Sequence, residues 1–233
     1  MALWQTERPT RCGLCADWNT QPLCAACVAQ YAPLKPRCQR CGLGVPAGVS
    51  CCGACLLSPP PFVQTIVAVD YRPPWTHLIQ RLKFQEACEW ARPLATLLAQ
   101  AVKAQAASTD MLLPLPLHEH RLRQRGFNQS GLLADALGRA LGLPVGTAAL
   151  LRWRDTGHQA ALDRQTRLHN LQGAFMPHPV QGHLLRGRHV ALVDDVMTTG
   201  ATCRAATLAA LEGGAASVSL WLLARTPAPD QAA

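Results

Sequence analysis

The chain has 233 residues, of which 49% are hydrophobic and 15% charged, so it can bury the core of an α/β domain and is not a disordered protein. It contains no apolar run long enough to span a membrane, and no basic segment followed by an apolar one near its start. We therefore expect no membrane insertion, no signal peptide and a cytoplasmic location. The net charge of +8 comes mostly from arginine. Such a charge fits either an arginine-biased composition or a partner that carries phosphate.

The first segment of the chain is rich in cysteine. Cysteines at CxxC spacing present two thiolates on one side of a tight turn, and two such turns can complete a tetrahedral Zn²⁺ site. A segment this short with few apolar residues needs such a staple to fold. We therefore predict a double zinc-ribbon module over residues 1–58, with two structural Zn²⁺ sites and glycines of positive φ in the turns. The predicted ligands are Cys12, Cys15, Cys24, Cys27, Cys38, Cys41, Cys52 and Cys55. Cys51 could replace Cys52, although the CxxC spacing favours Cys52.

The second predicted unit, residues 59–233, opens with a proline run and then alternates strands with helices. Residues 62–71 are rich in β-branched side chains, and helical periodicity follows over 75–84 and 89–107. Next come a strand at 111–115, an arginine-rich loop over 117–126, and a helix that Asn128 caps and Gly142 ends. A short strand at 148–152 leads into a polar stretch. The chain closes with a strand at 189–193, a helix at 201–212 and a strand at 217–223. This order predicts a mostly parallel sheet that helices cover on both faces.

The segment Val190 to Thr202, VALVDDVMTTGAT, places two acids and a Thr/Gly turn between a strand and a helix. Backbone N–H groups of a small-residue loop that opens a helix converge on an anion. The two acids would repel a phosphate, so they suit the vicinal hydroxyls of a ribose and positive charge developing on its ring. A purely structural acidic strand end is the alternative, but buried acids without a role are costly. We predict a ribose 5-phosphate site made by Asp194, Asp195, Thr198, Thr199, Gly200, Ala201 and Thr202, with the two aspartates as catalytic residues.

The arginines of residues 117–126 form a second phosphate candidate. Guanidinium groups bind pyrophosphate oxygens in a bidentate manner, and this segment also follows a strand of the predicted sheet. Arg121, Arg123 and Arg125 are thus predicted to bind pyrophosphate, with a solvated basic turn as the alternative. Lys83 is a further candidate, although a lone lysine on an amphipathic helix usually faces solvent.

VALVDDVMTTGAT resembles the hallmark of type I phosphoribosyltransferases, and the string RGFNQS (125–130), together with the cysteine-rich start, resembles the competence protein ComF family. The resemblance implies a type I phosphoribosyltransferase fold with a hood over the ligand, for which Arg154, Gln159 and Arg167 are candidates. It implies phosphoribosyl pyrophosphate bound with Mg²⁺, and transfer of the ribose phosphate to an acceptor that the sequence does not identify. It also implies a link to DNA uptake and natural transformation, with proteins of the uptake machinery as partners. The alternative is a non-catalytic factor that binds single-stranded DNA and is regulated by phosphoribosyl pyrophosphate.

Overall fold

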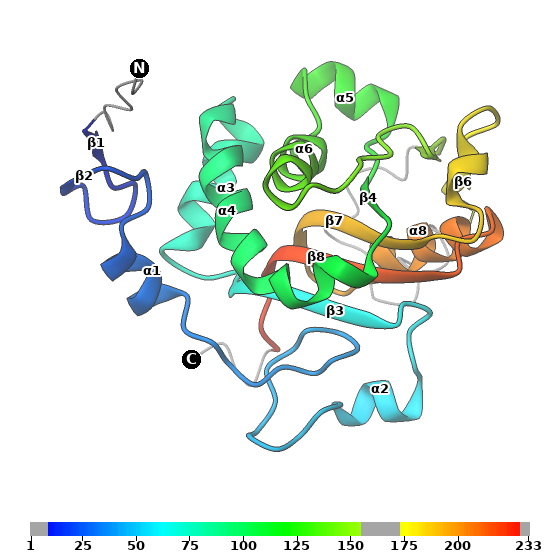
Figure 1. Ribbon diagram of the computed structural model, residues 1–233, viewed down its shortest axis with the longest axis horizontal. Helices are drawn as coiled ribbons and strands as arrows, with labels where there is room; N and C mark the ends of the chain where they lie inside the picture. The colour runs from blue at the N-terminus through cyan, green and yellow to red at the C-terminus, as the bar shows by residue number, and fades with distance from the viewer. Residues whose placement is uncertain (1–8, 155–172, 229–233) are drawn as a thin grey trace, which may run out of the picture.

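The fold is described for residues 9–154 and 173–228 of a computed structural model. Its centre is a sheet of four parallel strands in the order β3 (Gln64–Asp70), β8 (Ser217–Arg225), β7 (His189–Met197) and β4 (Met111–Pro114). Figure 1 shows β7 and β8 at the middle of this sheet. Because the strands are parallel, their carboxyl ends share one edge, where ligands bind in open α/β sheets.

Helices cover both faces of the sheet, as the alternation of strands and helices predicts. The helices α3 (Trp75–Phe84), α4 (Ala91–Val102) and α6 (Gln129–Leu141) share one core with the side chains of Ala191 and Val193. The helix α8 (Ala201–Glu212) shares the opposite core with Leu192. Successive side chains of β7 therefore enter opposite cores, which explains its continuous apolar sequence. This arrangement confirms the α/β fold that the phosphoribosyltransferase resemblance implies.

The remaining elements are short. The cysteine-rich segment holds β1 (Thr10–Arg11), β2 (Trp18–Asn19), α1 (Ala25–Tyr31) and α2 (Gly53–Leu57). Elsewhere lie the antiparallel pair β5 (Leu150–Arg152) and β6 (Phe175–Pro177), the helix α5 (Glu119–Arg125), and the 3-10 turns Cys88–Trp90, Lys103–Ser108 and Gly182–Leu185. Within the described residues, no helix combines the length and apolarity needed to cross a membrane.

The structure differs most from the predicted elements at two places. The strand expected at 189–193 continues to Met197, and the arginine-rich segment expected to be a loop contains α5. That helix lacks an apolar stripe, so periodicity could not reveal it. The side chain of His118 caps its first turn, Glu119 and Arg123 pair at i,i+4, and Gly126 ends it with φ +78°.

The cysteine-rich segment is packed on the α/β domain at two places (Figure 1). Near its start, Tyr31 accepts a 2.7 Å hydrogen bond from the indole N–H of Trp75. Near its end, the hydroxyl of Thr65 on β3 donates to the carbonyl of Arg40 at 2.5 Å. The predicted boundary between residues 1–58 and residues 59–233 stays a prediction. Hydrogen bonds join these two parts of the chain.

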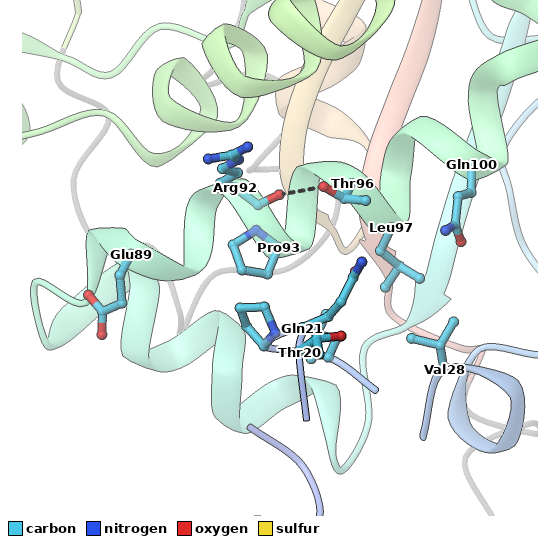
Figure 2. A pocket seen from close by; sticks show the side chains of 11 residues that line it. Thr20, Gln21, Val28, Glu89, Arg92, Pro93, Thr96, Leu97 and Gln100 are labelled. Carbon is cyan, nitrogen blue, oxygen red and sulfur yellow. Dashed lines mark hydrogen bonds between the residues drawn. The ribbon is translucent and has the colours of Figure 1, made fainter. Parts of the chain in front are cut away.

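A cleft of about 470 Å³ separates the start of the cysteine-rich segment from α4 (Figure 2). Thr20 and Gln21 contribute from one side and Thr96 and Leu97 of α4 from the other. The hydroxyl of Thr96 is already engaged with the carbonyl of Arg92, at 3.0 Å. None of the residues predicted to bind phosphate lines this cleft, so it is separate from the candidate site.

Gly13 in the first CxxC turn is required for close packing and not for the positive φ that the sequence predicts. Gly42 has φ +71°, as predicted, whereas Gly13 has no positive φ. A Cβ on Gly13 would instead lie 2.0 Å from the buried ring of Trp90. The glycine is therefore required for close packing of the turn on the α/β domain.

We predict that Gly13→Ala lowers the free energy of unfolding by about 1–3 kcal/mol, because the methyl group overpacks against Trp90. Gly53→Ala is the matched control, since a Cβ at Gly53 meets no atom within 4 Å. Urea titration of both variants measures the effect. Equal stability of the two variants would contradict the packing described here.

Candidate functional site

Two buried carboxylates lie in β7, near the carboxyl edge of the sheet. Asp194 and Asp195 are 8% and 2% exposed. The sequence places them at the end of a strand, but β7 continues for two residues beyond them, so both backbones are held by the sheet. One oxygen of Asp194 accepts from the hydroxyl of Ser130 at 2.8 Å and from the amide of Asp195 at 2.9 Å. The other aspartate accepts from the amide of Val196 at 2.8 Å.

Lys83 provides the positive charge beside this pair. Its Nζ lies 2.9 Å from Oδ2 of Asp195, and its side chain is only 18% exposed. The expected solvent-facing alternative for this lysine is therefore wrong. Ser130 was not singled out by the sequence, although it belongs to the RGFNQS string. The cap at Asn128, whose side chain accepts from the amide of Ser130, fixes this residue in the first turn of α6.

Burial and charge repulsion act together on Asp194. Desolvation and the neighbouring Asp195 raise its pKa to about 7, even though Lys83 and the hydrogen bond from Ser130 oppose the shift. Burial therefore favours the protonated, neutral form of Asp194. A bound cation or a pair of ligand hydroxyls would favour its charged form.

The predicted phosphate loop, residues 198–202, follows β7 directly. Thr198 and Thr199 are exposed, and Gly200 has φ +81°, a conformation that favours glycine. The helix α8 begins at Ala201, and the hydroxyl of Thr199 accepts from the Ala201 amide at 3.4 Å. Thr202 is the second residue of α8. The loop thus leads into the amino end of a twelve-residue helix, an arrangement suited to an anion.

The three predicted pyrophosphate ligands do not share one surface. Arg121 and Arg125 line a cleft of about 470 Å³ together with Lys83, which we call the basic cleft. The guanidinium of Arg125 donates to Gln129 at 2.5 Å. Arg123 forms an ion pair with Glu119 instead and does not line the basic cleft. Because Lys83 belongs both to this cleft and to the aspartate pair, the two halves of the candidate site are adjacent.

The predicted hood falls almost entirely outside the described residues. Gln159 and Arg167 lie within residues 155–172, which the structure does not describe. Arg154 is the last described residue before that range, and its guanidinium lies 4.5 Å from the ring centroid of Trp153.

The cysteines form two four-thiol clusters. The first cluster is Cys12, Cys15, Cys24 and Cys27, and the second cluster is Cys38, Cys41, Cys52 and Cys55. In each, the sulfur atoms lie within 4.8 Å of one another. The sulfurs of Cys15 and Cys24 are 3.9 Å apart, and those of Cys41 and Cys52 are 3.7 Å apart. Four thiolates around Zn²⁺ at about 2.3 Å require sulfur–sulfur distances of about 3.8 Å. Both clusters fit Zn²⁺.

Backbone amides in both clusters stabilise thiolate ligands. The sulfur of Cys12 accepts from the amide of Cys24 at 3.4 Å, and that of Cys38 accepts from the amide of Cys52 at 3.3 Å. Burial alone would raise the pKa of Cys12 and Cys38, but the amide hydrogen bonds outweigh it and lower each pKa to about 6. A thiolate that is available near neutral pH is the form that binds zinc. Cys51 lies outside the second cluster, with its sulfur 4.0 Å from that of Cys38.

Comparisons with known proteins identify the family of the chain. The chain is 38% identical to DNA utilization protein YhgH of Salmonella typhi over 232 residues, which covers 94% of this chain and 98% of the relative. It is 34% identical to competence protein F of Haemophilus influenzae over 208 residues, which covers 87% of this chain and 90% of the relative. The chain belongs to the competence protein F family. Competence protein ComFC of Bacillus subtilis is 36% identical over 117 residues, or 50% of this chain and 45% of the relative.

Other comparisons add little to the family assignment. No family profile matches the chain. Glutamine phosphoribosylpyrophosphate amidotransferase from B. subtilis overlaps 57% of this chain and 26% of its own, at 22% identity and a TM-score of 0.39. Phosphoribosylpyrophosphate synthetase from Mycobacterium smegmatis overlaps 55% and 31%, at 17% identity and a TM-score of 0.32. Overlaps of this size carry no argument about activity.

Because Cys52 and not Cys51 completes the second cluster, Cys52→Ser should lower the zinc content from two ions per chain to one. Cys51→Ser is the adjacent control and should retain both ions. Metal analysis of the purified variants decides between them. Loss of zinc from Cys51→Ser with retention in Cys52→Ser would reverse the assignment.

The pKa of Asp194 predicts how stability depends on pH. The folded protein holds a proton on Asp194 up to about pH 7, whereas the unfolded chain releases it near its usual value of about 3.9. The free energy of unfolding should therefore fall as pH rises from about 4, the unfolded pKa, to about 7, the folded pKa. Asp194→Asn should reduce the change of the free energy of unfolding with pH. The control Asp135→Asn, which changes an acid on α6 away from the pair, should leave that change as it is in the native protein. Denaturant titrations across this range measure it, and identical slopes in the native protein and Asp194→Asn would refute it.

Proposed function

We propose that this protein binds phosphoribosyl pyrophosphate with Mg²⁺ in the cytoplasm and acts as a phosphoribosyltransferase-like protein in DNA utilisation. The observation that carries the proposal is the buried pair Asp194 and Asp195, paired with Lys83 between the phosphate loop and the basic cleft. The names of the relatives, DNA utilization protein and competence protein F, support the biological part.

Each part of the ligand has a chemical counterpart in the site. Residues 198–202 suit the 5-phosphate, because they open α8 with backbone N–H groups and hydroxyls. The carboxylates of Asp194 and Asp195 suit the vicinal hydroxyls of the ribose. Arg121 and Arg125 suit the pyrophosphate, and we no longer assign Arg123 to it, because its guanidinium pairs with Glu119.

The same carboxylates fit Mg²⁺, which takes oxygen donors and usually binds through one or two carboxylates together with substrate phosphates. Asp194 and Asp195 would hold the ion. When bound, Mg²⁺ would supply positive charge to the pyrophosphate. The raised pKa of Asp194 means that cation binding and deprotonation are linked at this residue.

Transfer of the ribose phosphate to an acceptor is the enzymatic form of the proposal. Positive charge develops on the sugar ring as the pyrophosphate leaves, and two carboxylates in a water-poor position stabilise such charge. Lys83 holds Asp195 in place through their ion pair and neutralises part of the negative charge of the two aspartates. The acceptor is left unassigned.

A second candidate function is binding of single-stranded DNA, with phosphoribosyl pyrophosphate as a regulator. It is favoured by Phe84, whose side chain is 67% exposed at the basic cleft with the guanidinium of Arg125 at 5.3 Å from its ring centroid. Exposed aromatic rings beside cations bind bases by stacking and phosphates by charge.

Calorimetry with phosphoribosyl pyrophosphate and Mg²⁺ tests the first candidate. We expect binding by the native chain and loss of affinity by at least about 100-fold in Asp194→Asn plus Asp195→Asn, because each aspartate makes charged hydrogen bonds to the ligand. The control Asp135→Asn removes an acid from α6, away from the aspartate pair, and should bind phosphoribosyl pyrophosphate with native affinity. Failure of the native chain to bind phosphoribosyl pyrophosphate would contradict the proposal. Salt-sensitive affinity for single-stranded DNA without such binding would favour the second candidate.

A further inference from the structure

Arg225 joins the second cluster to the phosphate loop. It is the last residue of β8, paired in register with Met197 of β7, and it is 6% exposed. Its Nε donates to the carbonyl of Cys41 at 3.0 Å. Its Nη1 donates to the carbonyls of Met197 at 3.0 Å, of Thr226 at 2.9 Å, and of Thr198. One guanidinium therefore contacts a predicted zinc ligand and the start of the phosphate loop.

These contacts fix the direction of the loop backbone. In a trans peptide the carbonyl and the following N–H point in opposite directions. With the carbonyls of Met197 and Thr198 turned towards Arg225, the N–H groups of Thr198 and Thr199 point away from it. Those two amides are then presented to an anion instead of being turned inwards to a cation.

The buried charge of Arg225 needs a counter-charge. None of the ion pairs formed within residues 9–154 and 173–228 includes this guanidinium, and the groups to which it donates there are neutral carbonyls. A buried cation without an anion is costly. Zn²⁺ held by four thiolates carries a net negative charge, so the second cluster would supply an anion beside Arg225 when loaded.

The cluster and the loop also face each other across a cavity of about 320 Å³. It is lined on one side by the second cluster and on the other by the loop and the first turn of α8; Cys41, Cys52, Cys55, Thr199, Gly200 and Arg204 are among the lining residues. The first cluster has no such position. Its segment holds β1, β2 and α1 and packs through Gly13 on Trp90, and Figure 1 shows these elements on the side of the molecule away from α8.

We propose that Arg225 is a positioning residue through which zinc in the second cluster sets the affinity of the loop for the ligand's phosphate, whereas zinc in the first cluster serves stability alone. The inference rests on the proposed binding of phosphoribosyl pyrophosphate. The sequence motifs of the two clusters are alike and predict the same structural role for both. The proposal assigns support of the ligand site to the second cluster alone.

The first test is the affinity of the full, zinc-loaded chain for phosphoribosyl pyrophosphate with Mg²⁺, measured by calorimetry beside the zinc content. Arg225→Gln should weaken binding at least about tenfold while retaining both zinc ions, because it removes the charged donor to the loop carbonyls. Arg225→Lys keeps the positive charge but loses the planar set of N–H donors. Its affinity for phosphoribosyl pyrophosphate should therefore lie between those of the native chain and Arg225→Gln. Arg139→Gln, an exposed change on α6, is the control. Affinity of Arg225→Gln within twofold of native would overturn the inference.

The second test compares the two clusters through their last cysteines. Cys55→Ser should weaken binding by about the same factor as Arg225→Gln, whereas Cys27→Ser should lose one zinc ion and bind within twofold of native. Equal weakening by the two serine variants would overturn the inference. If Cys55→Ser does not fold, the Arg225 variants decide the question by themselves.

Hydrogen exchange of residues 196–204 without ligand separates this inference from the proposed function. Exchange there should be about tenfold faster in Arg225→Gln and Cys55→Ser than in the native chain and Cys27→Ser, because the contacts that hold the segment are lost. This result with no ligand binding by the native chain would reject the proposed function and retain the link between cluster and loop. Unchanged exchange in Arg225→Gln would reject the link.

Discussion

Two adjacent carboxylates buried in the central strand of a sheet are the most demanding feature of this molecule. Their charges repel each other, and burial removes the water that would solvate them. The structure compensates with Lys83 from the end of α3, Ser130 from the start of α6, and the amides of β7 itself. The positions of both helices are therefore tied to the acids, since a shift of either would leave a charge or a hydroxyl unpaired.

The same edge of the sheet collects the other chemical groups. Parallel strands bring the phosphate loop after β7, the basic cleft after β4 and Arg225 of β8 to one side. The second cluster reaches this edge through the carbonyl of Cys41, which accepts from Arg225 at the end of β8. The first cluster packs on Trp90, just before α4, and its segment lies at a different part of the surface (Figure 1). Similar cysteine motifs thus occupy unlike positions relative to the site.

Much of this architecture could be predicted from the sequence. The bounds of α3 and α8, the cap at Asn128 and the pairing of CxxC turns follow from local patterns, and the structure has them. The helix α5 was missed because charge pairing and a glycine stop form it without an apolar face. Contacts between distant segments leave no local pattern, so the role of Ser130 and the packing of Gly13 on Trp90 could not be predicted.

The strand order carries a consequence for how the chain is made. The strand β3 comes early in the sequence, yet its partner in the sheet is β8, the last strand. During synthesis, β3 must wait for almost the whole chain before it can pair, and an unpaired strand edge invites association with other chains. The cysteine-rich segment is made just before it and contacts it directly, since the amide of Thr65 donates to the carbonyl of Gln39 at 2.8 Å. We expect this contact to hold part of the β3 backbone in the nascent chain before β8 is made.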